Sequence, residues 1–174
     1  PDHPEVRGIV GWINGCEFSV ISDNIQAFKD INVLVVTSEA DILKLCRDKL
    51  DLYKFLSEKG IPCVETMDCN NLDYDKVDFP VYLKPRHGAG SIGNIKISSP
   101  ELLKAYLCES NEAMILQPYK KATEYGVDVY VDLVSGEITD IFVKEKIRMR
   151  AGETEKSLSI KCPEIEQIVK DIVK

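Results

Sequence analysis

Residues 79–93 read FPVYLKPRHGAGSIG: a hydrophobic strand, a lysine at its end and a glycine-rich loop. Ile95 to Ile97 then alternates like a second strand, so we expect a hairpin with the glycines at its tip. The glycines match G-x-G-x-x-G, but a dinucleotide-binding fold needs a helix directly after the loop, and here a helix is expected only from Pro100. No Lys-Ser or Lys-Thr follows the glycines, which excludes a Walker A loop.

A glycine loop of this kind can fold over a triphosphate and offer backbone N–H groups to its oxygens. Lys84, at the end of the strand, could reach the same phosphates as a compact positive charge. The alternative is an ordinary glycine turn beside a solvated lysine.

The segments before the hairpin predict an α/β arrangement. We expect a strand over 7–12, a helix over 17–30, a buried parallel strand over 33–36 and two helices on either side of Asp48. Ser38 has the chemistry of a helix cap, with Asp41 as the capping-box acid. Gly60 suits a left-handed stop to the second of these helices.

The segments after the hairpin predict antiparallel strands and helices. Ser99 and Pro100 open a helix whose Leu102, Leu103, Tyr106 and Leu107 are expected to face a core. Strands are expected over 113–119, 124–134 and 138–146, with a turn at 135–136, and an amphipathic helix over 163–174. The predicted fold class is therefore α/β followed by α+β.

Charge and composition exclude several classes of partner. The 174 residues include 22 basic and 29 acidic side chains, a net charge of −7, which disfavours nucleic acid and anionic membranes. The longest apolar runs are four or five residues, far short of a membrane helix, and no signal pattern opens the sequence. We therefore expect a cytoplasmic protein with no nucleic-acid or membrane partner, with a homo-oligomer as an open alternative.

The six cysteines include no C-x-x-C pair, and there are only two histidines, so a zinc site is not expected. The thiols are expected to be reduced and mostly buried. Cys63 and Cys69, in a predicted loop, are the candidates for an exposed redox or catalytic thiol.

Four segments together resemble the ATP-grasp superfamily, most closely its carbamoyl-phosphate-synthase-like branch. Residues 48–62 resemble the family's "DK…FL…GIP" segment, and residues 79–93 its glycine hairpin. Residues 114–128 are similar to the hinge strand and the acid that follows it, and residues 144–152 to an arginine-rich stretch of this branch. The ordered set covers most of the chain and is more specific than any one motif.

The resemblance implies that ATP is bound. Lys49 and Lys84 would neutralise phosphate charge, beneath a loop that includes Gly88, Gly90, Ser91 and Gly93. The adenine edge would meet Gln117, Pro118, Tyr119 and Lys120, and Glu124 would accept hydrogen bonds from the ribose. Arg148 and Arg150 would act as catalytic residues at the phosphates. Gln117 and Pro118 depart from the family pattern, which usually has an acid and then a backbone donor. The alternative for Gln117 and Glu124 is simple solvation, and for the two arginines surface salt bridges.

The family's Glu-x-Asn metal motif does not occur, so the ligands of Mg are expected outside this chain, and no metal-binding residue is assigned within it. The resemblance also implies four segments: the end of a pre-ATP-grasp domain over 1–47, a helical linker over 48–78, a nucleotide-binding subdomain over 79–146 and the start of a C-terminal subdomain over 147–174. The metal-binding half of that C-terminal subdomain is expected to be missing. The resemblance further implies a ligase that forms an acyl phosphate from a small carboxylate and joins it to an amine-type nucleophile. The chain alone is expected to be inactive. The alternatives are a non-catalytic nucleotide-binding or regulatory module, and a scaffold whose loop binds nothing.

Overall fold

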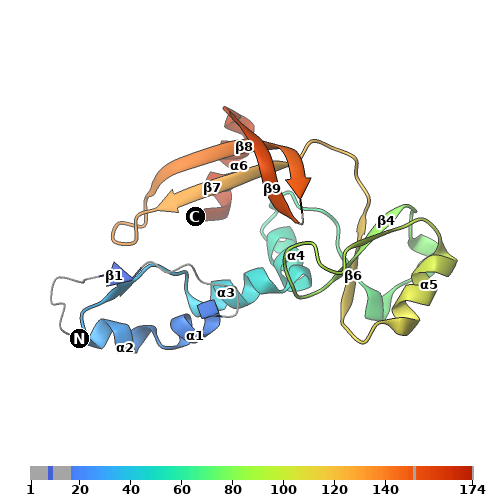
Figure 1. Ribbon diagram of the computed structural model, residues 1–174, viewed down its shortest axis with the longest axis horizontal. Coiled ribbons are helices and arrows are strands. Elements are labelled where there is room, and N and C mark those ends of the chain that lie inside the picture. Colours follow the sequence, from blue (N-terminus) through green and yellow to red (C-terminus); the bar gives the residue numbers. More distant parts are fainter. Residues whose placement is uncertain (1–7, 10–16, 151, 174) are drawn as a thin grey trace. The chain divides into compact units, whose positions relative to one another are not determined.

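The structure is a computed structural model that describes residues 8–9, 17–150 and 152–173 (Figure 1). The chain divides into two compact units, residues 1–48 and 49–174. No helix in the described ranges is long and apolar enough to cross a membrane. The predicted mixture of helices and strands is confirmed, with antiparallel sheets in the second unit. The finer divisions at 78/79 and 146/147 stay predictions.

The first unit contains a short parallel sheet and three helices. Strand β1 (Gly8–Ile9) pairs with β2 (Leu34–Val35), and the two strands are parallel, as expected. Of the predicted buried strand, Val35 is buried, whereas Leu34 and Val36 are about half exposed. The remainder of the predicted first strand lies outside the described residues. The helices are α1 (Glu17–Asp23), α2 (Ile25–Asp30) and α3 (Ala40–Arg47).

Two helix predictions in this unit are wrong in detail. The expected continuous helix over 17–30 is interrupted at Asn24, whose side-chain amide donates to the carbonyl of Val20 at 2.8 Å. Such local hydrogen bonds compete with the helical backbone, which explains the break. Helix α3 begins later than expected, because Glu39, and not Ser38, occupies its N-cap position. The Glu39 side chain makes no capping hydrogen bond.

The second unit opens with helix α4 (Lys49–Glu58), which ends just before Gly60 in the left-handed conformation, as predicted. A four-stranded antiparallel sheet follows, in the spatial order β3-β6-β4-β5. Its strands are β3 (Met67–Asp68), β4 (Val81–Pro85), β5 (Ile95–Ile97) and β6 (Met114–Pro118). Short 3-10 helices at Cys69–Asn71 and Tyr74–Lys76 join β3 to β4. The predicted hairpin of β4 and β5 around the glycine loop is therefore confirmed.

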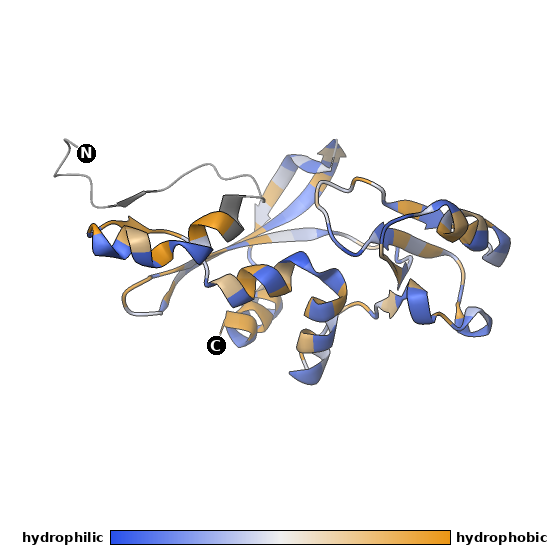
Figure 2. Cartoon of the chain, turned by 90° about the horizontal axis from the view of Figure 1, so that it is seen from below, coloured by the Kyte–Doolittle hydropathy of each residue, from blue (hydrophilic) through white to orange (hydrophobic). Residues whose placement is uncertain are grey.

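Helix α5 (Pro100–Glu109) covers one face of this sheet and creates the main core (Figure 1). Ser99 caps it by accepting a hydrogen bond from the Leu102 N–H, as predicted. Leu103 is fully buried, but Leu102 and Tyr106 are 38% and 41% exposed, which corrects their expected place in the core. The buried cluster consists of Val77, Val81, Leu83, Ile97, Leu103, Met114 and Leu116. Figure 2 shows hydrophobic and hydrophilic residues interspersed along the helices.

A three-stranded antiparallel sheet completes the unit. It consists of β7 (Tyr125–Val131), β8 (Ile138–Arg150) and β9 (Glu153–Ile160), followed by helix α6 (Pro163–Val173). Strand β8 continues four residues beyond its predicted end at Lys146. Strand β9 was not predicted, because its sequence ETEKSLSI is mostly polar and its side chains are mostly exposed.

The expectation that most cysteines are buried is wrong, because none of the five that the structure describes is fully buried. Cys46, Cys63 and Cys108 are exposed, whereas Cys69 and Cys162 are partly buried. Cys63 is thus exposed as predicted, and Cys69 is not. Burial, and to a lesser degree the neighbouring Asp68 carboxylate, raises the pKa of the Cys69 thiol to about 11. Cys16 lies outside the described residues.

We expect iodoacetamide to modify Cys69 much more slowly than Cys108 at about pH 8, because the thiolate is the reactive form. Because folding raises the pKa of Cys69 from about 9 to about 11, the neutral thiol stabilises the fold below about pH 9, and this contribution is lost as the pH rises towards 11. Peptide mass spectrometry over a time course measures both rates. Equal labelling of Cys69 and Cys108 in the folded protein would contradict the prediction.

Candidate functional site

The end of strand β4 places Lys84 on the face of the sheet opposite helix α5. Val81 and Leu83 are each 1% exposed in the core beneath α5. Side chains alternate along a strand, so Tyr82 and Lys84 point to the other face. There the Lys84 ammonium donates a 2.6 Å hydrogen bond to Oε1 of Gln117, from the adjacent strand β6.

Gln117 is held in turn by Thr66. Its Nε2 donates to the Thr66 hydroxyl at 2.9 Å, and that hydroxyl donates to the carbonyl of Val64 at 3.0 Å. Thr66 is buried, with 5% exposed. This chain of hydrogen bonds fixes the Gln117 amide with its oxygen towards Lys84, so Gln117 positions the lysine.

The environment of Lys84 suits an anion. Burial lowers the pKa of its ammonium, the positive charge of Lys49 lowers it further, and the Glu124 carboxylate acts in the opposite direction. A bound polyphosphate would offset both unfavourable effects, because it supplies negative charge and charge-assisted hydrogen bonds.

An open cavity of about 470 Å³ lies on this face of the sheet. Its lining residues are Val64, Tyr82, Lys84, Ser91, Asn94, Gln117, Pro118, Tyr119, Lys120 and Glu124. Seven of these ten were predicted from the sequence; Val64, Tyr82 and Asn94 were not. The strand alternation that places Tyr82 beside Lys84 is the signal that could have identified it.

Two tyrosine rings form part of the cavity wall. The rings of Tyr82 and Tyr119 are stacked, with centroids 6.0 Å apart and planes 15° from parallel. The Lys96 ammonium lies 3.9 Å from the centre of the Tyr119 ring, and Lys84 lies 5.2 Å from that of Tyr82. Aromatic faces of this kind can stack with a planar heterocycle.

Lys49 lies at the base of the glycine loop rather than along the cavity wall. Its ammonium donates to the carbonyls of Pro85 at 2.9 Å and Gly88 at 3.0 Å, with a longer contact of 3.4 Å to that of Arg86. Its backbone N–H also donates to the Arg86 carbonyl. In this arrangement the Lys49 side chain holds the first part of the loop, and its positive charge lowers the pKa of Lys84.

The loop itself requires left-handed backbone at several positions. Gly88, Gly90, Ser91 and Gly93 all have positive φ, between 59° and 113°. At Gly93 an added Cβ would lie 2.9 Å from Pro85 Cγ, so the two ends of the loop pack together. Of the predicted loop residues, only Ser91 lines the cavity.

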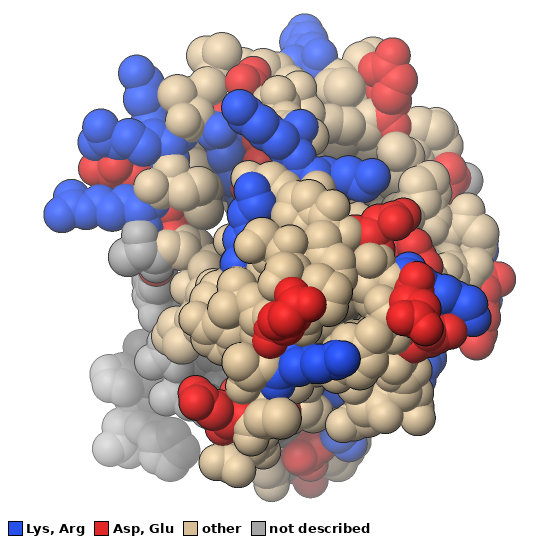
Figure 3. Space-filling model, turned by 90° about the vertical axis from the view of Figure 1, so that its right-hand side faces the viewer, with Lys and Arg blue, Asp and Glu red and all other residues tan. Residues whose placement is uncertain are grey.

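The basic residues of strand β8 are paired with acids. Lys146 and Glu124, which lies just before β7, form an ion pair at 2.5 Å, and the two predicted arginines, Arg148 and Arg150, both pair with Glu155 of β9. Figure 3 shows Lys and Arg side chains gathered over the upper part of one face, with Asp and Glu beside and below them. The structure thus places both arginines in salt bridges, and their contact with phosphate stays a prediction.

The acidic residues in the described ranges do not gather into a cluster. No group of three or more Asp, Glu, His or Cys side chains converges within the described ranges. Asp128 pairs with Lys144 at 2.6 Å, and Asp132 accepts hydrogen bonds from the Val134 and Ser135 N–H groups, which lower the pKa of its carboxyl. No chemical step is therefore assigned to a metal ion within the described residues.

The turn between β8 and β9 touches the glycine loop. Gly152 has φ 81°, and a Cβ there would lie 2.2 Å from the carbonyl oxygen of Gly90.

We expect Gly152→Ala to lower the free energy of unfolding by about 1–3 kcal/mol more than Gly136→Ala. Gly136 is the matched control, because it has φ 73° in another hairpin turn with open space around it. Equal effects in urea titrations would mean that the contact with Gly90 is dispensable.

The sequence matches no known family profile and no curated protein. Solved structures do match. N5-carboxyaminoimidazole synthetase from Staphylococcus aureus, solved with ADP, aligns with 96% of this chain and 46% of its own, with a TM-score of 0.72 and 14% identity. D-alanine–D-alanine ligase from Helicobacter pylori aligns with 90% of this chain and 52% of its own, with a TM-score of 0.64 and 12% identity. L-amino acid ligase from Bacillus licheniformis aligns with 90% of this chain and 39% of its own, with a TM-score of 0.60 and 14% identity.

This chain therefore spans about half the length of these structures or less. At such low identity the likeness concerns the fold alone. Two of the three proteins are amino acid ligases and one is a synthetase solved with ADP, and they do not distinguish the predicted carbamoyl-phosphate-synthase-like branch. The fold of this chain, including the glycine hairpin and the Lys84 cavity of the second unit, matches part of each of these three structures.

Proposed function

We propose that the cavity beside Lys84 binds ATP, and that this chain is the ATP-binding portion of an ATP-grasp ligase resembling carbamoyl-phosphate synthase. One observation supports this above the others. Lys84 is a partly buried ammonium beside a second cation, and it lines a cavity together with the strand-end residues Gln117 to Lys120. A desolvated cation of this kind favours a phosphate ligand.

The cavity offers distinct surroundings to the parts of a nucleotide. The Tyr119 N–H already donates to the Pro80 carbonyl, and Pro118 has no N–H, so the Lys120 N–H is the donor left to meet an adenine edge. Glu124 would accept hydrogen bonds from the ribose while it stays close to Lys146. The phosphates would then lie against Lys84, Ser91 and the N–H groups of the glycine loop, with Lys49 holding the base of that loop.

The proposed reaction of the whole ligase has two steps. A carboxylate oxygen of a small substrate attacks the γ-phosphorus of ATP, which forms an acyl phosphate and releases ADP. An amine then attacks the acyl carbon, forms the amide and releases phosphate. Arg148 and Arg150 would assist only if they exchange Glu155 for a phosphate oxygen. The alternative is a non-catalytic nucleotide-binding or regulatory module.

Titration with the ATP analogue AMP-PNP tests the proposal. We expect binding of about millimolar affinity, because the described residues provide no metal site. Amide signals of Gln117, Tyr119 and Lys120 should shift in nitrogen-15 NMR spectra, whereas those of helix α6 should not. Signals that stay unchanged around the cavity at saturating analogue would contradict the proposal.

We also expect this chain to release phosphate from ATP at the background rate, with or without added carboxylates. The reason is that phosphoryl transfer loses most of its electrostatic stabilisation without metal carboxylates. A coupled phosphate assay with Lys84→Ala as the control measures this. Release clearly above the control would show that described residues assemble a metal site when ATP binds.

A further inference from the structure

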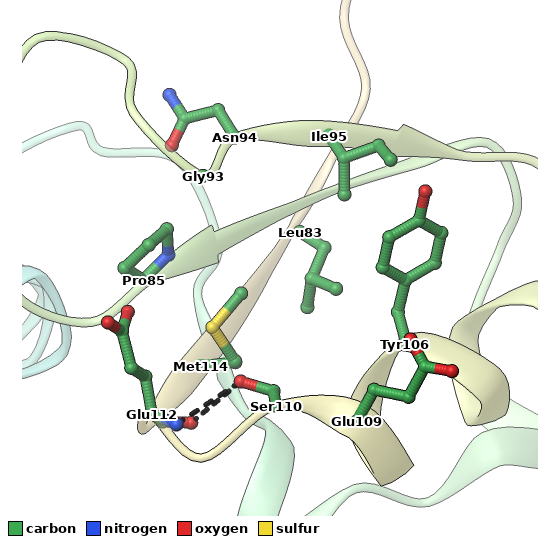
Figure 4. Close-up of a pocket in the computed structure, with 10 residues that line it drawn as sticks. All are labelled: Leu83, Pro85, Gly93, Asn94, Ile95, Tyr106, Glu109, Ser110, Glu112 and Met114. Carbon is green, nitrogen blue, oxygen red and sulfur yellow. Dashed lines mark hydrogen bonds between the residues drawn. The ribbon is translucent and has the colours of Figure 1, made fainter.

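A second cavity, of about 400 Å³, lies on the other face of the four-stranded sheet, beside helix α5 (Figure 4). Its floor is apolar: Leu83, Ile95 and Met114 come from strands β4, β5 and β6, and the ring of Tyr106 closes one side. Leu83 and Lys84 point to opposite faces of β4, so this cavity is distinct from the proposed nucleotide site. The two cavities share only Asn94 in their walls.

The rim of this cavity is negatively charged. Glu109 and Glu112 lie at opposite edges of the apolar floor in Figure 4. Neither carboxylate has an ion pair in the described part of the chain, and no lysine or arginine lines the cavity. Helix α5 also ends here, with no basic residue in its last turn, so the negative end of its dipole adds to the same potential.

The turn that bears Glu112 is held in place. The Ser110 hydroxyl accepts a hydrogen bond from the Glu112 N–H at 3.2 Å and donates to the Glu112 carbonyl at 3.3 Å. These two bonds are drawn in Figure 4. The acidic rim is thereby fixed relative to the end of helix α5, which lowers the entropy cost of binding there.

We infer that this cavity is a second ligand site, for a small organic amine with an apolar body. The body would lie on Leu83, Ile95 and Met114, and the ammonium would pair with the carboxylate of Glu112 or Glu109. Charge complementarity favours this class over the two alternatives of the same shape. A carboxylate would be repelled by both glutamates, and a neutral alcohol would lack the charge-assisted hydrogen bond.

Three small probes with the same phenyl ring test this inference: 2-phenylethylamine, 2-phenylethanol and phenylacetate. Protein labelled with carbon-13 in its methionine methyl groups reports the site directly, because of its three methionines only Met114 lines the cavity. We expect the amine to shift the Met114 signal at millimolar concentration, about five-fold more tightly than the alcohol, with little effect of phenylacetate. Met67 and Met149 serve as internal controls.

The charge dependence is tested by the double variant Glu109→Gln/Glu112→Gln, which should abolish the preference for the amine over the alcohol. Glu137→Gln, an exposed turn residue away from the cavity, is the matched control and should leave the preference intact. Equal binding of all three probes or no shift of Met114 would overturn the inference, as would shifts in nitrogen-15 spectra that are confined to Gln117 and Tyr119. Failure of AMP-PNP to bind would contradict the proposed function and leave this inference standing.

Discussion

Replacing Lys84 by alanine is expected to weaken the binding of AMP-PNP by about 1–3 kcal/mol, the range of a charge-assisted hydrogen bond. Lys84 is the one lysine that combines partial burial, a lowered pKa and a place in the cavity wall within the described residues. Its loss would also leave Oε1 of Gln117 without its donor. That oxygen would then repel the phosphate oxygens at the place where Lys84 should attract them. Calorimetry of the two proteins measures the difference.

Lys144→Ala is the matched control for this prediction. Lys144 lies on strand β8, does not line the cavity and pairs with Asp128 at 2.6 Å. Its removal takes away the same charge and leaves the cavity unchanged, so any general electrostatic effect on a nucleotide should be equal in the two variants. Equal loss of affinity in both would remove Lys84 from the site.

The sequence was sufficient to predict the hairpin and its lysine because both depend on local patterns. Alternation along Val81 to Lys84 determines which face Lys84 occupies, and the glycines permit the left-handed loop. Helix α5 was predicted for the same reason, since Ser99 and Pro100 act within one turn of the residues they affect.

The rest of the candidate site depends on contacts between distant residues. Thr66 reaches Gln117 across 51 residues of sequence, and Lys49 reaches the Gly88 carbonyl across 39. The part of strand β9 that holds Glu155 is wholly polar, so the partner of Arg148 and Arg150 could not be predicted either. These are pairings that only tertiary structure creates, and single-sequence patterns contain no signal for them.

Leu103→Ala is expected to lower the free energy of unfolding of the second unit by about 2–5 kcal/mol. Leu103 is 0% exposed and packs from helix α5 onto Val81, Leu83 and Ile97 of the sheet. Truncation removes apolar contacts and leaves a void that close-packed strands cannot fill. Urea titration followed by the NMR signals of Ile97 and Leu116 measures the unfolding of this unit.

Leu102→Ala provides the control, because it makes the same change one residue earlier in the same helix. Leu102 is 38% exposed, so we expect a cost below about 1 kcal/mol.

The comparison also bears on the candidate site, since the strand that buries Leu83 beneath α5 is the strand that presents Lys84 on the opposite face. If the core fixes that strand, Leu103→Ala should weaken AMP-PNP binding as well, and Leu102→Ala should not. Equal costs for the two variants would show that helix α5 does not hold the sheet in the way its buried residues indicate.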